Sequence, residues 1–235
     1  EAAEALIARM TACFDHYMAI NALRWHFPQM FPAYLNDPRM MPIRRGCAPP
    51  SCLRHIYTSW ILRSETGAVF VMDCGDASVI DALKASLVDS EITAVEGLWI
   101  THTHDDHVEA VPAFQQAFDC ELIADESVAT VIADPLAWRL PCITPNIARV
   151  DRCPAHGESW QWHEFTMTSF HFPGQSHYHG GLLVEGQGLR MFFGGDSFTP
   201  AGIDDYCVNN RNFLGAGVGF MKCLDILDAT KPAMI

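Results

Sequence analysis

The stretch THTHDDHVEA brings three histidines and two aspartates close together in the middle of the chain. It has the form H-x-H-x-D-H, with His102, His104, Asp106 and His107 at the named positions. Alternate side chains of an extended segment point the same way, so His102 and His104 can bind one metal ion together. Asp106 and His107 come one turn later and can bind a second. Imidazole and carboxylate groups suit zinc, whereas an aspartate-capped helix start would explain one histidine but not three.

The elements around this stretch must hold it at the edge of a sheet. The run GLWITHTH at 97–104 predicts a strand that leads into the histidines, and 108–118 predicts the helix that follows. Strands and helices are mixed without strict alternation, which favours sheets flanked by helices. Further strands are expected at 55–64, 68–75, 120–125, 159–172, 180–188, 189–197 and 231–235, and further helices at 77–89, 126–134 and 217–229.

Residues 1–52 differ in character from the rest of the chain. Apolar residues at helical spacing predict a helix over 1–23. The prolines within 25–52 rule out regular helix there and indicate an extended arm. We expect this arm to pack either on the body of the domain or on a second subunit, and the latter would make a homodimer. Two domains are therefore expected, an N-terminal helix and arm at 1–52 and the main domain at 53–235.

Composition narrows the class of partner. The chain of 235 residues is 49% hydrophobic and carries a net charge of −13, which disfavours binding to nucleic acid. No apolar run approaches the roughly 20 residues of a membrane span, and a small-molecule substrate is expected. Nine cysteines without a C-x-x-C motif predict free thiols in a reducing compartment, so we expect a cytoplasmic protein. Basic residues are dense only at Arg39, Arg44, Arg45 and Arg54, which either receive an anionic group or are simply solvated.

In the order of its motifs, the chain resembles the metallo-β-lactamase superfamily of metallohydrolases over about 53–235. The resemblance implies a four-layer αββα sandwich. Its first motif corresponds to Asp73-Cys74-Gly75, where Asp73 would orient the metal ligands. The second is the H-x-H-x-D-H stretch itself. The fourth, Gly-Asp after a strand, corresponds to Asp196, which would bridge two metal ions.

Two motifs depart from the family pattern. The third motif places a histidine directly after Pro-Gly, where this chain has Gln175. His179 is the preferred replacement as metal ligand, with His177 as the alternative. The fifth motif is a histidine after a final strand, and the given sequence ends with that strand, TKPAMI. We therefore expect the domain to be truncated before its last metal-binding loop, with two zinc ions in a complete domain and one as an alternative in this chain.

The resemblance also implies an activity. Histidine at position 104, where redox di-iron members of the family carry glutamate, favours zinc-dependent hydrolysis. Asp196 argues against a true β-lactamase, and thioesterases of the glyoxalase II type carry an additional C-terminal helical domain. The expected protein is a hydrolase that uses a metal-bound hydroxide on an ester, thioester, lactone or phosphodiester, with Asp106 as the catalytic residue that orients the nucleophile. The alternative is a non-catalytic binding or regulatory domain with an incomplete metal site.

Overall fold

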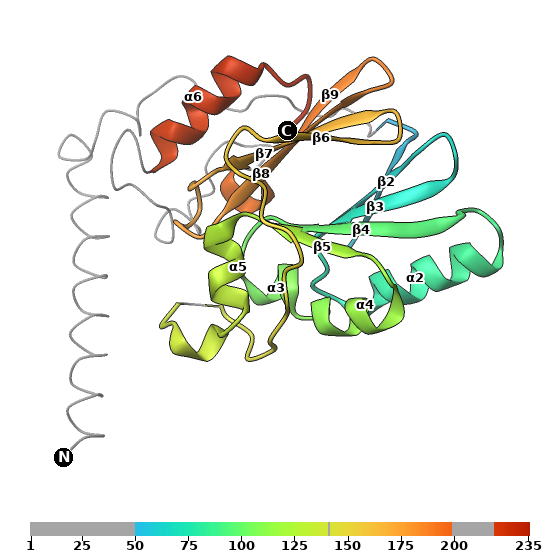
Figure 1. Cartoon of the computed structure of the whole chain (residues 1–235), viewed down its shortest axis with the longest axis horizontal. Coiled ribbons are helices and arrows are strands. Elements are labelled where there is room, and N and C mark those ends of the chain that lie inside the picture. The colour runs from blue at the N-terminus through green and yellow to red at the C-terminus, as the bar shows by residue number, and fades with distance from the viewer. Residues whose placement is uncertain (1–49, 141, 199–218) are drawn as a thin grey trace.

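Two β-sheets pack face to face, with helices on both outer sides (Figure 1). The computed structural model describes residues 50–140, 142–198 and 219–235. In Figure 1, α2, α3, α4 and α5 lie against the first sheet and α6 lies over the second. The predicted four-layer αββα arrangement is therefore confirmed.

The first sheet contains five strands in the order β1-β2-β3-β4-β5. The pairs β1–β2 and β2–β3 are antiparallel, whereas β3–β4 and β4–β5 are parallel. Parallel neighbours require a crossover connection, which α2 provides between β3 and β4, and α3 with α4 between β4 and β5. The strands are β1 (Leu53–Ile56), β2 (Ser59–Arg63), β3 (Ala68–Met72), β4 (Ala94–Ile100) and β5 (Glu121–Ala124).

The second sheet contains four antiparallel strands in sequence order, β6-β7-β8-β9. The helix α6 (Phe220–Thr230) buries Cys223, Ile226 and Leu227 against it. The strands are β6 (Ser159–Trp162), β7 (Phe165–His171), β8 (Gly180–Gly186) and β9 (Leu189–Phe193).

Aspartate side chains cap the N-termini of α2 and α5. Asp76 accepts a hydrogen bond from the Ser78 amide at 2.8 Å, and Asp125 accepts one from the Ser127 amide at 3.0 Å. These caps satisfy amide groups that have no partner within the helix. The remaining short elements are α3 (Asp105–Val108), α4 (Val111–Ala117) and the 3-10 turns η4 (Pro135–Ala137) and η5 (Gly195–Ser197), while α2 spans Ala77–Val88 and α5 spans Glu126–Ile132.

The sequence of β3 shows how the layers are specified. All five of its residues are buried, which explains an apolar run without alternating polar positions. Phe70 and Met72 face the core between the sheets, whereas Val69 and Val71 face the helices. The same division holds for Leu98 and Trp99 of β4, so both strands are covered on two sides.

Two expected strands were wrong in extent. The segment predicted as one strand at 55–64 is divided between β1 and β2 by a turn in which Tyr57 has a φ of 54°. The segment predicted at 159–172 is a hairpin, β6 and β7, with His163 at a φ of 47°. Both turns place a residue other than glycine in the left-handed region, so neither shows the usual sequence signal for a turn.

The expected strand at 231–235 is reduced to a short pairing beside β9. Met234 forms an isolated parallel bridge with Met191, and the Phe192 amide donates to the Met234 carbonyl at 2.9 Å. The predicted helix at 1–23 and nearly all of the proline-rich arm lie outside the described residues, so the homodimer stays a prediction. Among the helices that are described, none is both long and apolar enough to cross a membrane.

Candidate metal centre

The candidate metal residues lie where the two sheets meet. Beyond β4, His102 forms an antiparallel bridge with His179, the residue before β8. The Gly180 amide also donates to the Thr101 carbonyl at 2.6 Å. The chain that leaves β4 and the chain that enters β8 are thus joined by main-chain hydrogen bonds, which bring residues from both halves of the sequence to one place.

One group of possible metal ligands consists of His102, His104 and Asp196. Each offers a donor atom, and these atoms all lie within 4.8 Å of one another. Donor atoms that share a zinc ion lie within about 4 Å of each other, because each is about 2 Å from the metal. A small adjustment of the side chains would therefore bring this group around one ion.

A second group of possible ligands consists of Asp106, His107 and again Asp196. His107 Nε2 is 3.3 Å from Asp196 Oδ1 and 3.7 Å from Asp106 Oδ2. The imidazole is buried, whereas about two fifths of each carboxylate side chain is exposed. Asp196 belongs to both groups, which is the arrangement of a carboxylate that bridges two ions.

Asp73 positions the His107 imidazole of the second ligand group through a hydrogen bond. Its Oδ2 accepts hydrogen bonds from His107 Nδ1 at 2.8 Å and from the Thr101 hydroxyl at 2.7 Å. Its Oδ1 accepts one from the Thr101 amide, also at 2.7 Å. With Nδ1 engaged by Asp73, the Nε2 atom of His107 is directed at the two carboxylates.

Gly75 allows the motif residues to approach this closely. A Cβ atom at this position would lie 1.7 Å from the main-chain carbonyl oxygen of Asp106. No side chain can be accommodated there without moving the turn that carries Asp106 and His107.

The charges of the cluster match a cation site. Burial alone would lower the pKa of His107, but the carboxylates of Asp73 and Asp196 raise it to about 10. Burial would raise the pKa of Asp196, but hydrogen bonding and the charge of His107 lower it to about 2. Burial lowers the pKa of His104. The carboxylates thus attract positive charge that a proton on His107 supplies in the metal-free protein, and the residues fit a metal ion in that role.

His179, the predicted ligand of the third motif, lies outside both groups. Its ring stacks on that of His102, with centroids 4.8 Å apart and planes 11° from parallel. Its Nδ1 is 3.2 Å from the Gly180 carbonyl and its Nε2 is 3.3 Å from the Ser197 hydroxyl. Burial lowers the pKa of His179 to about 3, so the ring is neutral.

Gln175, not His177, lies beside the cluster. The Gln175 side chain is buried, and its Nε2 donates to Asp196 Oδ2 at 3.4 Å. His177 is exposed, and its ring contacts that of His171 with centroids 5.2 Å apart. The sequence favours His179 over Gln175 as the metal ligand of the third motif. The signal that pointed to Gln175 was its position directly after Pro-Gly.

A cavity of about 530 Å³ opens beside the cluster. Its polar side is formed by Asp73, Thr101, His107 and Asp196. Its apolar side includes Trp60, Met72, Met191, Phe193 and Met234. A substrate here would have its apolar part in contact with the inner faces of both sheets and its reactive part at the carboxylates.

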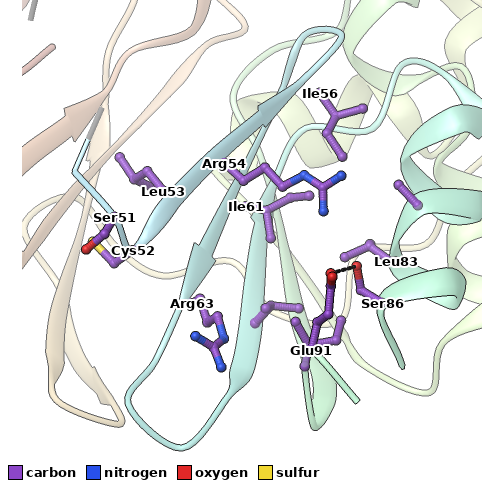
Figure 2. Close-up of a pocket in the computed structure, with 13 residues that line it drawn as sticks. Ser51, Cys52, Leu53, Arg54, Ile56, Ile61, Arg63, Leu83, Ser86 and Glu91 are labelled. Carbon is purple, nitrogen blue, oxygen red and sulfur yellow. Dashed lines mark hydrogen bonds between the residues drawn. The ribbon is translucent and has the colours of Figure 1, made fainter. Parts of the chain in front are cut away.

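A second cavity, of about 390 Å³, lies on the opposite face of the β1–β2 hairpin (Figure 2). Arg54 and Ile61 extend from the hairpin toward α2 in this view, and the Ser86 hydroxyl donates to Glu91 Oε2 at 3.0 Å. Arg54 is the one member of the predicted basic region that lies among the described residues. It is thus separated from the metal cluster by the sheet itself.

Comparison with known proteins identifies the family. A model of the metallo-beta-lactamase superfamily matches residues 54–208, which is more than half of the chain. The chain therefore belongs to the metallo-β-lactamase superfamily.

Its relatives include hydroxyacylglutathione hydrolases. That of Stenotrophomonas maltophilia is 34% identical over 98 residues, or 42% of this chain and 33% of the relative. That of Aeromonas hydrophila is 29% identical over 151 residues, or 61% of this chain and 47% of the relative. The chain thus spans between a third and a half of the length of these relatives.

Solved structures of similar fold include metallo-β-lactamases. A metallo-β-lactamase of Cronobacter sakazakii with a HARLDQ motif superposes with a TM-score of 0.57 at 15% identity, covering 73% of this chain and 63% of that one. A β-lactamase from Chitinophaga pinensis gives 0.55 at 18% identity, covering 73% and 67%. At this level of identity the likeness shows the fold and not the substrate.

Proposed function

We propose that this chain is the metal-binding part of a zinc-dependent hydrolase that acts on a thioester or a similar activated ester. The observation that carries the proposal is the pair of ligand groups that share Asp196 beside a partly apolar cavity. The similarity to hydroxyacylglutathione hydrolases supports a thioester over a lactone or phosphodiester.

The ligand groups assign a place to each ion. His102, His104 and Asp196 would hold one zinc ion, and Asp106 and His107, with Asp196 shared, would hold the other. Bound zinc lowers the pKa of a coordinated water to about 7 and polarises a carbonyl group. Two ions are proposed for the complete site, and one remains the alternative for this chain.

The protein side chains position the reaction around the ions. Asp106, whose side chain is about two fifths exposed, would orient the attacking water and accept its proton. Asp73 keeps the proton of His107 on Nδ1, so that Nε2 remains directed at the site. The apolar wall of the cavity would hold the acyl chain and limit the access of bulk water.

Metal analysis combined with a substrate panel tests this function. The purified chain, reconstituted with zinc, is expected to hold at least one ion and to hydrolyse a hydroxyacyl-glutathione thioester faster than p-nitrophenyl acetate or bis(p-nitrophenyl) phosphate. Asp106→Asn is expected to lose turnover, to weaken the ion assigned to Asp106 and His107, and to keep the ion assigned to His102 and His104. Stoichiometric zinc without hydrolysis of any of the three would contradict the proposal.

The alternative function is a binding domain that uses the same fold without catalysis. The observation that favours it is the glutamine at the position where the family has a histidine ligand. Under this alternative, zinc loading would raise the thermal stability of the chain, but neither the wild type nor Asp106→Asn would hydrolyse any substrate of the panel.

A further inference from the structure

A two-residue turn, Tyr57-Thr58, joins β1 to β2 at the cavity beside the metal cluster. Tyr57 has a φ of 54°, in a region that residues other than glycine rarely adopt. Such backbone conformations persist where the surrounding structure holds them, and they gather at functional sites. The contacts of Thr58, the second residue of the turn, show what this turn is held against.

Thr58 forms a hydrogen bond with the turn that carries the H-x-H-x-D-H motif. Its hydroxyl donates to the main-chain carbonyl of Asp106, which lies 48 positions further along the chain. The bond therefore joins the β1–β2 hairpin to α3, the short helix that follows β4. It is a tertiary contact between the wall of the cavity and the proposed catalytic residue.

The carbonyl of Asp106 depends on a donor from outside α3, because this helix has only four residues. In a longer helix this carbonyl would accept a hydrogen bond from the amide of Ala110, four positions later. The Ala110 amide instead donates to the Cys74 carbonyl at 3.0 Å. The Thr58 hydroxyl thus supplies a donor to a carbonyl that lacks its usual helical partner.

A second element contacts the main chain at the same place. A Cβ atom on Gly75 would lie 1.7 Å from the carbonyl oxygen of Asp106. The Cys74 amide donates to the neighbouring His107 carbonyl at 2.9 Å. The hairpin and the turn that contains Cys74 and Gly75 therefore both fix the main chain of Asp106.

The side chain of Asp106 has less support of its own. It is about two fifths exposed, and its Oδ2 lies 3.7 Å from His107 Nε2, which is longer than a hydrogen bond. The His107 imidazole, in contrast, is buried and held by Asp73 at 2.8 Å. The direction of the Asp106 carboxylate is therefore set mainly by the main chain from which it projects.

We propose that Thr58 is a positioning residue for Asp106. Its hydroxyl fixes the main chain that aims the carboxylate at the ion held with His107 and at the attacking water. The inference rests on the proposed function, in which Asp106 is both a metal ligand and the residue that orients the water. Because Thr58 acts through the main chain of Asp106, its loss should lower kcat and weaken that ion without changing KM.

The variant Thr58→Val tests the proposal, because it removes the hydroxyl and keeps the shape of the side chain. The affinity for the ion at Asp106 and His107 should fall about tenfold, as for the loss of a group that orients a ligand. The affinity for the ion at His102 and His104 should not change. For the hydroxyacyl-glutathione thioester, kcat should fall about tenfold at an unchanged KM. Chelator competition measures the affinities, and steady-state kinetics separates kcat from KM.

Matched variants separate the hydroxyl from the packing of the side chain. Thr58→Ser keeps the donor and should restore both kcat and zinc affinity. Thr93→Val removes a comparable bond, from a threonine hydroxyl to the Thr66 carbonyl at 3.2 Å, at the other end of β4. This control should leave zinc affinity and kinetics unchanged. Thr58→Ala also lacks the hydroxyl and takes the place of Thr58→Val if that variant does not fold.

The outcomes distinguish this inference from the proposed function. If the wild type hydrolyses the thioester and Thr58→Val equals it in kcat and zinc affinity, the inference is overturned and the proposed function stands. A raised KM at unchanged kcat would make Thr58 a substrate contact instead, and equal losses in Thr58→Ser and Thr58→Val would make it a packing residue. A wild type that binds zinc without turnover would overturn the proposed function, while the zinc affinity of Thr58→Val still decides the inference. A wild type that takes up no zinc would overturn both.

Discussion

The two faces of the β1–β2 hairpin carry cavities that differ in kind. On the inner face, the cavity of about 530 Å³ ends at His107 and at Asp73 and Asp196, which both contact its ring. On the outer face, the cavity of about 390 Å³ is lined by Arg54, Arg63 and the Ser86–Glu91 pair among apolar side chains (Figure 2). Both are sizeable, so volume does not distinguish them. The two cavities differ in their buried polar groups, which converge on the Asp196 carboxylate only in the inner cavity.

The origin of this difference lies in the chain path. The inner cavity collects the segments that leave β3, β4 and β9, so residues distant in sequence meet there. The outer cavity is formed by strand faces and one side of α2, whose side chains mainly pack. Four predictions test whether only the inner cavity is a functional site.

The largest effect is expected at the shared carboxylate. Asp196→Ala removes a donor from both ligand groups, so zinc content should fall below one ion per chain. Turnover of a thioester should drop by roughly three orders of magnitude or more. Elemental analysis and steady-state kinetics measure the two effects. Full zinc content in this variant would contradict the bridging role of Asp196.

The second largest effect is expected at Asp73, which forms a hydrogen bond with His107. Asp73→Asn keeps the shape of the side chain but weakens the hydrogen bond that holds His107, so zinc affinity should fall about 10–100-fold. Asparagine also tolerates the φ of 64° at this position. Chelator competition measures the affinity, and circular dichroism checks the fold. An unchanged affinity would show that Asp73 has no part in orienting His107.

A third effect depends on pH. Because the pKa of His107 is raised to about 10, the metal-free protein holds a proton that zinc must displace. Apparent zinc affinity should therefore increase about tenfold for each pH unit between 7 and 9. In the metal-free protein the same raised pKa stabilises the fold below about pH 6.5, and this contribution is lost toward pH 10. Calorimetry in buffers of different ionisation enthalpy counts the released proton, and affinity independent of pH would contradict the assignment.

The smallest effect is expected in the outer cavity. Ser86→Ala removes the hydrogen bond to Glu91 and should lower the free energy of unfolding by about 1 kcal/mol. Zinc content and thioester turnover should match the wild type. Denaturant unfolding and the same metal and kinetic assays provide the comparison. A loss of zinc here would mean that the two cavities are coupled through the hairpin.

The sequence predicted the two ligand groups of the H-x-H-x-D-H stretch, but it did not predict how the third motif contacts them. The spacing of the H-x-H-x-D-H stretch was enough to expect two neighbouring ligand groups, because it depends on local geometry alone. The partner at the third motif depends on how the turn at Pro173-Gly174 packs against η5, which no local pattern records. The divided strands were missed for a similar reason, since Tyr57 and His163 adopt turn conformations that their residue types rarely take.

The hydrogen bond between Gly180 and Thr101 has a consequence for the stability of the whole domain. It joins the chain that leaves one sheet to the chain that enters the other, and the donor residues His102 and Asp196 come from those same two halves. An ion held by both residues would act as a removable cross-link that closes a long loop of the polypeptide. Under the proposed function, removal of that ion by a chelator would therefore weaken the connection between the two sheets beside the reaction site.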